Sequence, residues 1–279
     1  MKKNMDYLHW KKRDDKKLTM LTCYDYPTAV LQDKAGLDVI FVGDSLGTNE
    51  LGYEHEISVT LGDIIHHLKA VRRGVKEAYL LADMPYKTYE DPGMALVTAK
   101  ELVLNGADGV KLEGMREDVI SHLYSNGIEV WGHLGYTPQL HNKAVVQGKT
   151  FDSAKFLLNG AIALQAAGAS MIVLELIPEE LGKVITEKLS IPTIGIGAGR
   201  FTDGQVLIVQ DMLGINPFDL RHSKNYGNVG QIMLKAFQSY ANEVENGEFP
   251  QLRNVRNMND EEREKLLNCC LYTNSSNEE

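Results

Sequence analysis

The sequence repeats one pattern three times, as AGLDVIFVGDS at residues 35–45, NGADGVKLEG at 105–114 and AAGASMIVLEL at 166–176. In each stretch a small residue and a glycine precede a short apolar run, and an acidic residue ends the run. Glycine commonly follows the last turn of a helix, and a short, continuously apolar run is typical of a parallel strand covered on both faces. Each stretch therefore predicts the end of a helix, a buried strand and a carboxylate at the end of that strand.

Eight short apolar runs predict eight strands along the chain. They lie at residues 18–22, 39–42, 79–81, 109–112, 129–132, 171–174, 193–196 and 206–209. Helical patterns lie between them at 61–73, 92–105, 116–125, 154–167 and 179–188, several of them followed by glycine. Such repeated βα units favour either a closed barrel or a doubly wound sheet. A length of 279 residues suits one (β/α)8 barrel, which commonly needs about 250.

We expect one barrel domain over residues 1–279, with an N-terminal extension at about 1–17 and a helical C-terminal tail at about 228–279. The polar stretch 257–279 reads as a short helix with a frayed end. The longest connections without a clear helix or strand are 47–58 and 136–150. Loops that follow barrel strands often form the walls or lid of an active site, although plain surface loops are the alternative.

Composition excludes several classes of function. A net charge of -9 and a pI of about 5.4 give no basic surface for nucleic acid. The sequence has neither the apolar core of a signal peptide nor a run of about 20 apolar residues for a membrane span. The three cysteines, Cys23, Cys269 and Cys270, lack metal-site spacing, so we expect a reducing, cytoplasmic compartment.

Acidic residues end four of the predicted strands, at Asp44, Asp83, Glu113 and Glu175. In a barrel all strands point their carboxyl ends at one face, so these carboxylates converge there. Asp44, Asp83 and Glu113 would repel one another unless a hard divalent cation lies among them. Oxygen ligands without a nearby Cys or His favour magnesium over zinc. The alternative is that each acid caps the helix after its strand.

Glu175 lies inside VLELIP at residues 173–178. Its apolar neighbours predict a buried carboxylate, which suits a general base that takes a proton from carbon next to a carbonyl group. A structural glutamate with satisfied hydrogen bonds remains the alternative.

Other polar residues near the same strand ends are candidates for substrate binding. Lys111 lies two residues before Glu113, so both side chains face the same side of their strand, and Lys111 can reach a carboxylate or a developing oxyanion. His133 and Gln139, in GHLGYTPQ at 132–139, could orient substrate or ligands, although a single histidine is more often structural. The hydroxyl or backbone N–H of Ser45 could bind the same carboxylate.

The stretch IPTIGIGAGRFTDGQ at residues 191–205 contains a glycine-rich turn after a strand. Its G-x-G-x-G spacing differs from the G-x-G-x-x-G form of dinucleotide-binding loops, and it lies late in the chain. We therefore reject a dinucleotide site. The small residues either admit a bulky ligand or allow tight packing.

Ten stretches, in order between about residues 19 and 226, resemble the ketopantoate hydroxymethyltransferase family. They read TCYDYPTA, VGDSLG, LGYEHEISVTLGDIIHHLKAVRRG, LLADMPY, GADGVKLEG, VWGHLGYTPQ, VVQGK, VLELIP, IPTIGIGAG and TDGQVLIVQDMLG. The resemblance implies a TIM barrel of the phosphoenolpyruvate-binding type. It also implies transfer of a hydroxymethyl group from 5,10-methylenetetrahydrofolate to 3-methyl-2-oxobutanoate, which gives ketopantoate in pantothenate and coenzyme A biosynthesis.

The resemblance also implies roles for residues at matching positions. Asp44 and Asp83 become Mg²⁺ ligands, and Glu113 completes the metal site directly or through water. Glu175 becomes the proton acceptor that forms a magnesium-stabilised enolate, which then attacks the iminium form of the folate. Substrate contacts are expected from Asp44, Ser45, Asp83, Lys111 and His133. The family also implies a homo-oligomer, a decamer built as a pentamer of dimers.

The sequence departs from the family pattern in two places. Ser58 stands where proline is common, and residues 220–222, from Leu220 to His222, replace a basic, aromatic PKF-like segment. Lys224 and Tyr226 still fit the pattern. The altered segment affects the expected contacts with the edge of the folate or with a C-terminal interface, and leaves the metal chemistry as it is.

Two alternatives come from other functional classes. One is a related magnesium barrel that cleaves or forms C–C or C–P bonds, such as an isocitrate lyase or a phosphonomutase. Those enzymes resemble one another in a Lys-Lys-Cys-Gly-His type loop, which this sequence lacks. The other is a barrel that only binds or scaffolds, which the retained set of acidic residues and lysine disfavours.

Overall fold

Eight parallel strands close into one barrel in the computed structural model, which describes residues 2–141, 143–216 and 220–273. Each strand pairs with the next in the sequence, and β1 pairs with β8 through Leu18 and Gly204 to close the ring. The strands are β1 Leu18–Thr22, β2 Val39–Val42, β3 Tyr79–Asp83, β4 Gly109–Lys111, β5 Val130–Gly135, β6 Met171–Glu175, β7 Thr193–Ile196 and β8 Gly204–Leu207. The closed ring confirms the predicted barrel and excludes the doubly wound sheet.

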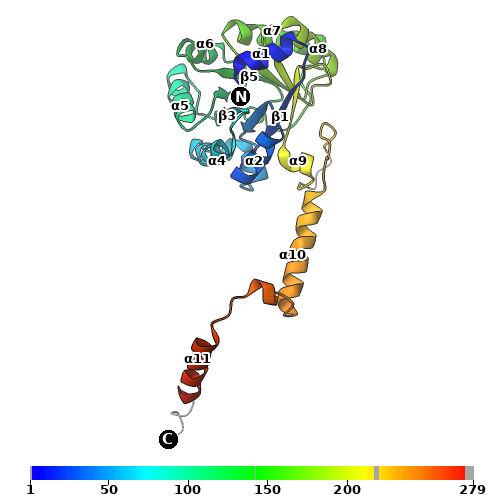
Figure 1. Cartoon of the computed structure of the whole chain (residues 1–279). Helices are drawn as coiled ribbons and strands as arrows, with labels where there is room; N and C mark the ends of the chain where they lie inside the picture. The colour runs from blue at the N-terminus through cyan, green and yellow to red at the C-terminus, as the bar shows by residue number, and fades with distance from the viewer. Residues whose placement is uncertain (1, 142, 217–219, 274–279) are drawn as a thin grey trace. The chain divides into compact units, whose positions relative to one another are not determined.

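Helices follow the strands and form the outer layer of the barrel (Figure 1). They are α2 Tyr26–Lys34, α3 Leu46–Asn49, α4 Leu61–Gly74, α5 Pro92–Leu104, α6 Glu117–Ser125, α7 Phe151–Ala166, α8 Glu179–Lys188 and α9 Val209–Leu213. Local sequence explains where several begin. Asp25 and Asp91 cap α2 and α5 through their side chains, with a proline at one of the first two positions of each helix, and Thr60 forms a capping box with Asp63 at α4.

The predicted strand at 206–209 is partly wrong. Strand β8 begins two residues earlier, at Gly204, and Val209 already begins α9. The apolar run of residues 206–209 crosses the boundary between the two elements, so hydrophobicity alone does not mark where the strand ends. The backbone N–H of Val209 donates to the hydroxyl of Thr22 at 3.0 Å, which ties the start of α9 to the end of β1.

The connection at 47–58 is also more regular than expected. It contains the end of α3 and the short 3-10 helix η1, Glu56–Ser58. Thr48 donates a hydrogen bond to Glu56 at 3.1 Å and links the two turns. The connection at 136–150 has neither helix nor strand in its described residues, as expected.

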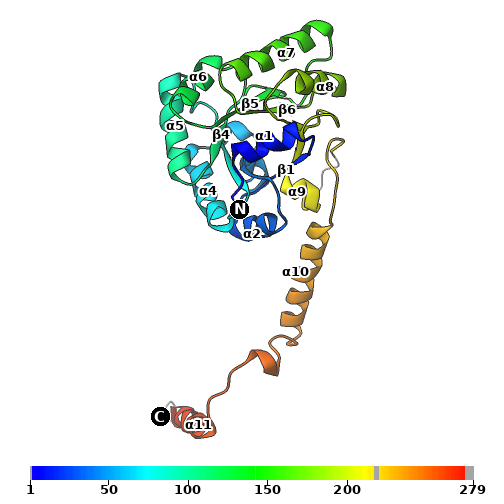
Figure 2. The ribbon, with the colours of Figure 1, turned by 45° about the horizontal axis from the view of Figure 1, so that its top comes forward.

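Helix α1, Met5–Arg13, lies across the amino end of the barrel (Figure 2). Its Leu8 is fully buried in the cluster of apolar side chains that fills the barrel interior. That cluster includes Met20, Phe41 and Trp131. A second apolar cluster lies between the outside of the barrel and the helices. The plug formed by α1 leaves the carboxyl ends of the strands as the open end of the barrel.

Contacts divide the chain into two compact units, Met1–Asn228 and Val229–Glu279. The second unit holds α10 Val229–Glu245, the 3-10 helix η2 Leu252–Asn254 and α11 Asp260–Thr273. Helix α11 confirms the short helix expected within 257–279, and the rest of that stretch, residues 274–279, lies outside the described residues. Within the described part of the chain, no helix is both long enough and apolar enough to cross a membrane.

Candidate functional site

A cavity of about 290 Å³ opens at the carboxyl end of the barrel, and all eight strands contribute to its lining directly or through the residues that follow them. The seven site residues predicted from the sequence all line it: Asp44, Ser45, Asp83, Lys111, Glu113, His133 and Glu175. These residues come from β2 to β6 and the turns that follow. Convergence of the four acidic side chains, inferred from the barrel rule alone, is therefore present.

The carboxylates of Asp44, Asp83 and Glu113 are almost completely buried, with residue exposures of 5%, 1% and 1%. The backbone N–H of Asp44 donates to Oδ2 of Asp83 at 2.9 Å, so the ends of β2 and β3 are in direct contact. Helix capping falls to other residues, because Ser45 precedes α3, Asp91 caps α5 and Arg116 precedes α6. The capping alternative for the three acids is wrong.

Lys111 is the cation among these acids. Its Nζ lies 2.8 Å from Oδ1 of Asp83, and both side chains are buried. Burial alone would lower the pKa of Lys111, but the charges of Asp83, Glu113 and Asp44 outweigh it and raise that pKa. Lys111 therefore stays protonated and supplies one positive charge against three carboxylates.

The three acids respond differently to this environment. Burial raises the pKa of Asp44 well above its ordinary value, and the charges of Asp83 and Glu113 raise it further. Burial also raises the pKa of Asp83, which Lys111 offsets only in part. Burial opposes ionisation of Glu113 as well, but the hydrogen bond and charge of His133 outweigh it and lower the pKa of Glu113.

His133 connects two of the carboxylates. Its Nδ1 lies 3.3 Å from Glu113 and its Nε2 lies 3.2 Å from Oε2 of Glu175. Burial and the charge of Lys111 lower the pKa of His133, but Glu113 and Glu175 outweigh them, so the net shift is upward. The position of His133 between the metal-site candidate and the base candidate gives it a larger part in the site than a single structural histidine.

Glu175 is the last residue of β6 and is more exposed than its apolar neighbours in the sequence suggested. Its side chain is 19% exposed and faces the cavity, whereas Leu174 and Ile177 are buried in the core. The following residue, Leu176, has a positive φ of 46°. This backbone turn ends the strand and leaves the carboxylate of Glu175 accessible to a ligand in the cavity.

Ser45 lies beside a tyrosine that the sequence did not suggest. The hydroxyl of Tyr24 lies 2.8 Å from Oγ of Ser45, and Tyr24 is buried. Glu56 and Tyr136, from the two long connections, line the cavity, which supports their interpretation as walls. Leu220 and His222 line it too, so the segment that departs from the family pattern borders the site.

Tight packing explains the glycine-rich turn after β7. A Cβ on Gly199, whose φ is +83°, would lie 2.5 Å from Cβ of Glu179. A Cβ on Gly197, at φ +64°, would lie 2.7 Å from Cδ2 of Leu176, next to Glu175. Of the two reasons expected for these small residues, packing accounts for both positions.

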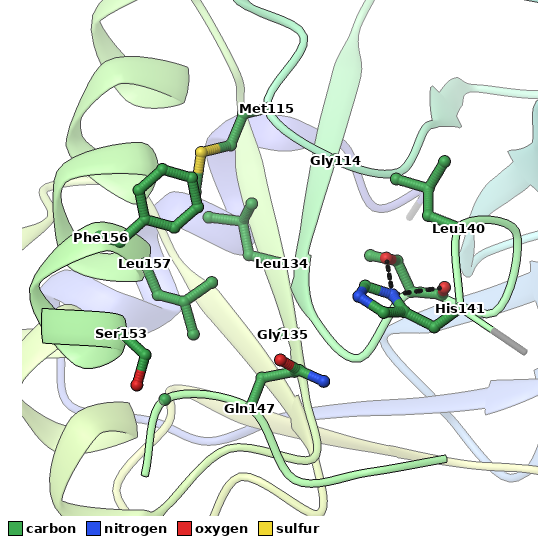
Figure 3. Close-up of a pocket in the computed structure, with 12 residues that line it drawn as sticks. Gly114, Met115, Leu134, Gly135, Leu140, His141, Gln147, Ser153, Phe156 and Leu157 are labelled. Carbon is green, nitrogen blue, oxygen red and sulfur yellow. Dashed lines mark hydrogen bonds between the residues drawn. The ribbon is translucent and has the colours of Figure 1, made fainter. Parts of the chain in front are cut away.

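A second cavity, of about 310 Å³, lies between the 136–150 connection and helix α7 (Figure 3). Figure 3 shows Met115, Leu134 and Phe156 on one side of it and His141 on the other. Nδ1 of His141 is hydrogen-bonded to the hydroxyl of Thr137 at 2.9 Å. The lining is mainly apolar and carries none of the seven predicted residues, all of which line the first cavity.

The donor set of the first cavity fits a hard divalent cation. Three buried carboxylates face one lysine, and burial together with the charges of Asp83 and Glu113 raises the pKa of Asp44. As the described side chains stand, no three acidic, histidine or cysteine groups are close enough to hold a metal ion together. Since Lys111 lies against Asp83, cation binding requires the ammonium group of Lys111 to move aside and the carboxylate of Asp83 to turn toward the ion.

Comparison with known proteins agrees with the family resemblance expected from the sequence. A family model described as ketopantoate hydroxymethyltransferase matches residues 2–252. Two relatives carry the name 3-methyl-2-oxobutanoate hydroxymethyltransferase. The one from Thermosipho melanesiensis is 48% identical over 246 residues, or 86% of this chain and 93% of its own. The one from Dehalococcoides mccartyi is 46% identical over 277 residues, or 96% of this chain and 98% of its own.

Solved structures support the fold. A phosphonopyruvate hydrolase in complex with oxalate and Mg²⁺ has a TM-score of 0.61 at 11% identity and covers 96% of this chain and 98% of its own. A 2,3-dimethylmalate lyase of the PEP mutase/isocitrate lyase superfamily has a TM-score of 0.58 at 13% identity and covers 96% and 100%. These likenesses confirm the predicted (β/α)8 barrel fold.

Proposed function

Because the chain belongs to the ketopantoate hydroxymethyltransferase family, we propose that it transfers a hydroxymethyl group from 5,10-methylenetetrahydrofolate to 3-methyl-2-oxobutanoate. The shared name of the relatives supports a one-carbon transferase that makes ketopantoate. The observation that carries the finer chemistry is one cavity that holds three buried carboxylates, a lysine and a separate, accessible Glu175.

Asp44 and Asp83, with Glu113 directly or through water, are our candidates to hold Mg²⁺. When bound, the ion would withdraw charge from the keto acid and make its C3 proton easier to remove. Lys111 lies within the same group and can hold the keto oxygen as charge develops there. Ser45, at the start of α3, can bind the substrate carboxylate, with Tyr24 orienting its hydroxyl.

Glu175 is our candidate for the base that accepts the C3 proton. Its exposure to the cavity supports this role, and Nε2 of His133 lies 3.2 Å from its Oε2. The resulting carbon nucleophile attacks the one-carbon unit of the folate in its iminium form, and water releases tetrahydrofolate and the hydroxymethyl product.

The walls of the cavity suit a branched alkyl chain. Met20, Phe41, Val173, Ile196 and Val206 contribute apolar surface next to the polar group. An isopropyl group can lie on this surface while the carboxylate and keto oxygens face the acids and lysine. This arrangement supports a short, branched 2-keto acid as the substrate.

Deuterium exchange at C3 of 3-methyl-2-oxobutanoate tests the first chemical step without the folate. We expect Mg²⁺-dependent exchange in the unchanged protein and its near loss in Glu175→Gln and in Asp44→Asn. Glu187→Gln is the matched control, because Glu187 lies on the exposed surface of α8, away from the cavity. Exchange at the unchanged rate in Glu175→Gln would remove that residue as the base.

Product analysis separates the transferase from a lyase-like barrel. With 5,10-methylenetetrahydrofolate present, we expect ketopantoate and tetrahydrofolate to form in equal amounts. Mass spectrometry measures both products. Cleavage of a 2-hydroxy acid or phosphonate in place of ketopantoate formation would favour the alternative.

A homo-oligomer, a decamer as the family implies, is part of the same proposal. The exposed apolar side chains of Ile232, Phe237 and Tyr240 on α10 support self-association. Sedimentation velocity measures the assembly, and a monomer at micromolar concentration would contradict it.

A further inference from the structure

Gln139 contacts two of the three buried carboxylates at once. Its backbone N–H donates to Oε2 of Glu113 at 3.0 Å, and its side-chain Nε2 donates to Oδ2 of Asp44 at 2.7 Å. Gln139 lies in the connection after β5 and is only 4% exposed. One residue of a loop therefore joins carboxylates that follow β2 and β4.

The amide of Gln139 is itself held in place. Its Nε2 also donates to the backbone oxygen of Met84 at 3.1 Å, and its Oε1 accepts a hydrogen bond from the hydroxyl of Tyr89. Tyr89 is buried, and its hydroxyl oxygen also lies 3.4 Å from the backbone N–H of Glu113. These bonds involve both the nitrogen and the oxygen of the amide, so the segment that follows β3 fixes the orientation of the amide.

We propose that Gln139, held by Tyr89, is a positioning residue that fixes the carboxylates of Asp44 and Glu113 in the orientation needed to bind a divalent cation. This inference rests on the proposed function, because it assumes that the acids hold a metal ion. Groups that hydrogen-bond to metal ligands orient them and tune their affinity for the ion. A positioning residue acts through the ligands, without touching the ion or the substrate.

The chemistry of an amide suits this position. Glutamine donates to a carboxylate without adding charge, whereas a lysine would add a cation that competes with the metal ion and a glutamate would add repulsion. In a buried group of three acids, an uncharged donor fixes orientation and leaves the negative charge available. The bond to Met84 ties the loop to the segment after β3, whereas the bond to Asp44 reaches a carboxylate that lines the cavity.

Cation affinity is the readout that separates positioning from simple stabilisation. We would titrate the purified full-length protein with Mn²⁺ as the probe and measure free Mn²⁺ by electron paramagnetic resonance. Gln139→Met keeps the length of the side chain and removes its donor and acceptor. The matched control is Gln165→Met, because Gln165 accepts hydrogen bonds from the backbone N–H groups of Ser190 and Ile191, away from the cavity.

We expect Gln139→Met to weaken Mn²⁺ binding by about 10- to 100-fold, as for other residues that orient metal ligands. Tyr89→Phe removes one hydroxyl and keeps the ring, so we expect a smaller loss of about 2- to 10-fold. Gln165→Met should lower the melting temperature and leave the affinity unchanged. In the C3 exchange assay, Gln139→Met should need more Mg²⁺ but approach the unchanged rate at saturation.

The outcomes distinguish this inference from the proposed function. Unchanged Mn²⁺ affinity in both Gln139→Met and Tyr89→Phe, beside normal binding by the unchanged protein, would overturn the role of Gln139 alone. If Gln139→Met does not fold, unchanged affinity in Tyr89→Phe overturns it. Failure of the unchanged protein to bind Mn²⁺ would refute the cation site, and both proposals with it.

Discussion

Replacing Lys111 with methionine should destabilise the cation-free protein strongly. Lys111 is 3% exposed, its Nζ lies 2.8 Å from Asp83, and Asp44 and Glu113 are close enough to raise its pKa. Methionine keeps much of the volume of the side chain and removes its charge. The three acids would then be buried together without the lysine.

The size of the effect follows from the burial of this ion pair. Removing one partner of a buried pair costs about 3–5 kcal/mol, because an uncompensated charge remains. For a domain of this size, each kcal/mol lowers the melting temperature by about 2–4 °C, which gives a fall of roughly 6–20 °C. If the acids bind Mg²⁺, the ion at about 100 times its dissociation constant should raise the free energy of unfolding of the variant by about 2.7 kcal/mol.

Thermal unfolding followed by circular dichroism, with and without Mg²⁺, measures both effects. Lys183→Met is the matched control, because Lys183 is about half exposed and its pair with Glu187 spans 3.8 Å. We expect that control to change stability by less than about 1 kcal/mol. Equal melting temperatures for Lys111→Met and Lys183→Met would refute the reasoning that Lys111 neutralises the buried acids.

Three further predictions follow from the same contacts. Since the folded-state pKa of Asp44 is raised, Asp44 costs stability as pH rises from 3.8 toward that raised pKa, so Asp44→Asn should be more stable than the unchanged cation-free protein at neutral pH and lose this advantage as pH falls toward 3.8, in paired thermal melts. Tyr24→Phe removes the partner of Ser45 and should raise KM for the keto acid by about 2- to 10-fold with little change in kcat, measured by initial rates. Asp38→Asn breaks the 2.7 Å pair with Lys11 at the closed end of the barrel and should cost about 3 kcal/mol without changing kcat. Because Lys11 helps outweigh burial and lower the pKa of Asp38, this deficit should hold at neutral pH and shrink only as pH falls below 3.8.

Strand positions and the convergence of the acids were predictable from sequence. Continuous apolar runs marked all eight strands to within three residues at each end, because parallel barrel strands are buried on both faces. The carboxylates after β2, β3, β4 and β6 could then be assigned to one end of the barrel by geometry alone.

Helix α1 was not predicted. Its sequence, MDYLHWKKR, is mostly polar and buries only Leu8 completely. The helix is stabilised by contacts with distant parts of the chain, such as Lys12 with Asp203 at 2.8 Å. Local periodicity contains no signal for contacts of this kind.

The parts of the site that sequence reasoning underestimated lie in contacts between elements. The bridge that His133 makes from Glu113 to Glu175 depends on the spacing of β4, β5 and β6. The hydrogen bonds of Gln139 depend on how an irregular connection folds back over the strand ends. GHLGYTPQ gave both residues as candidates, but the only signal for their importance was their position after a predicted strand.

The plug at the amino end of the barrel has a consequence for synthesis of the protein. Helix α1 leaves the ribosome before the barrel strands, yet its His9 is hydrogen-bonded to Ser170 and its Lys12 to Asp203, which lies 191 residues later in the chain than Lys12. At about 5–20 residues per second, roughly 10–40 s separate the two ends of that contact. During this interval Leu8 lacks its complete burial site, so its side chain stays exposed to water until β8 closes the ring.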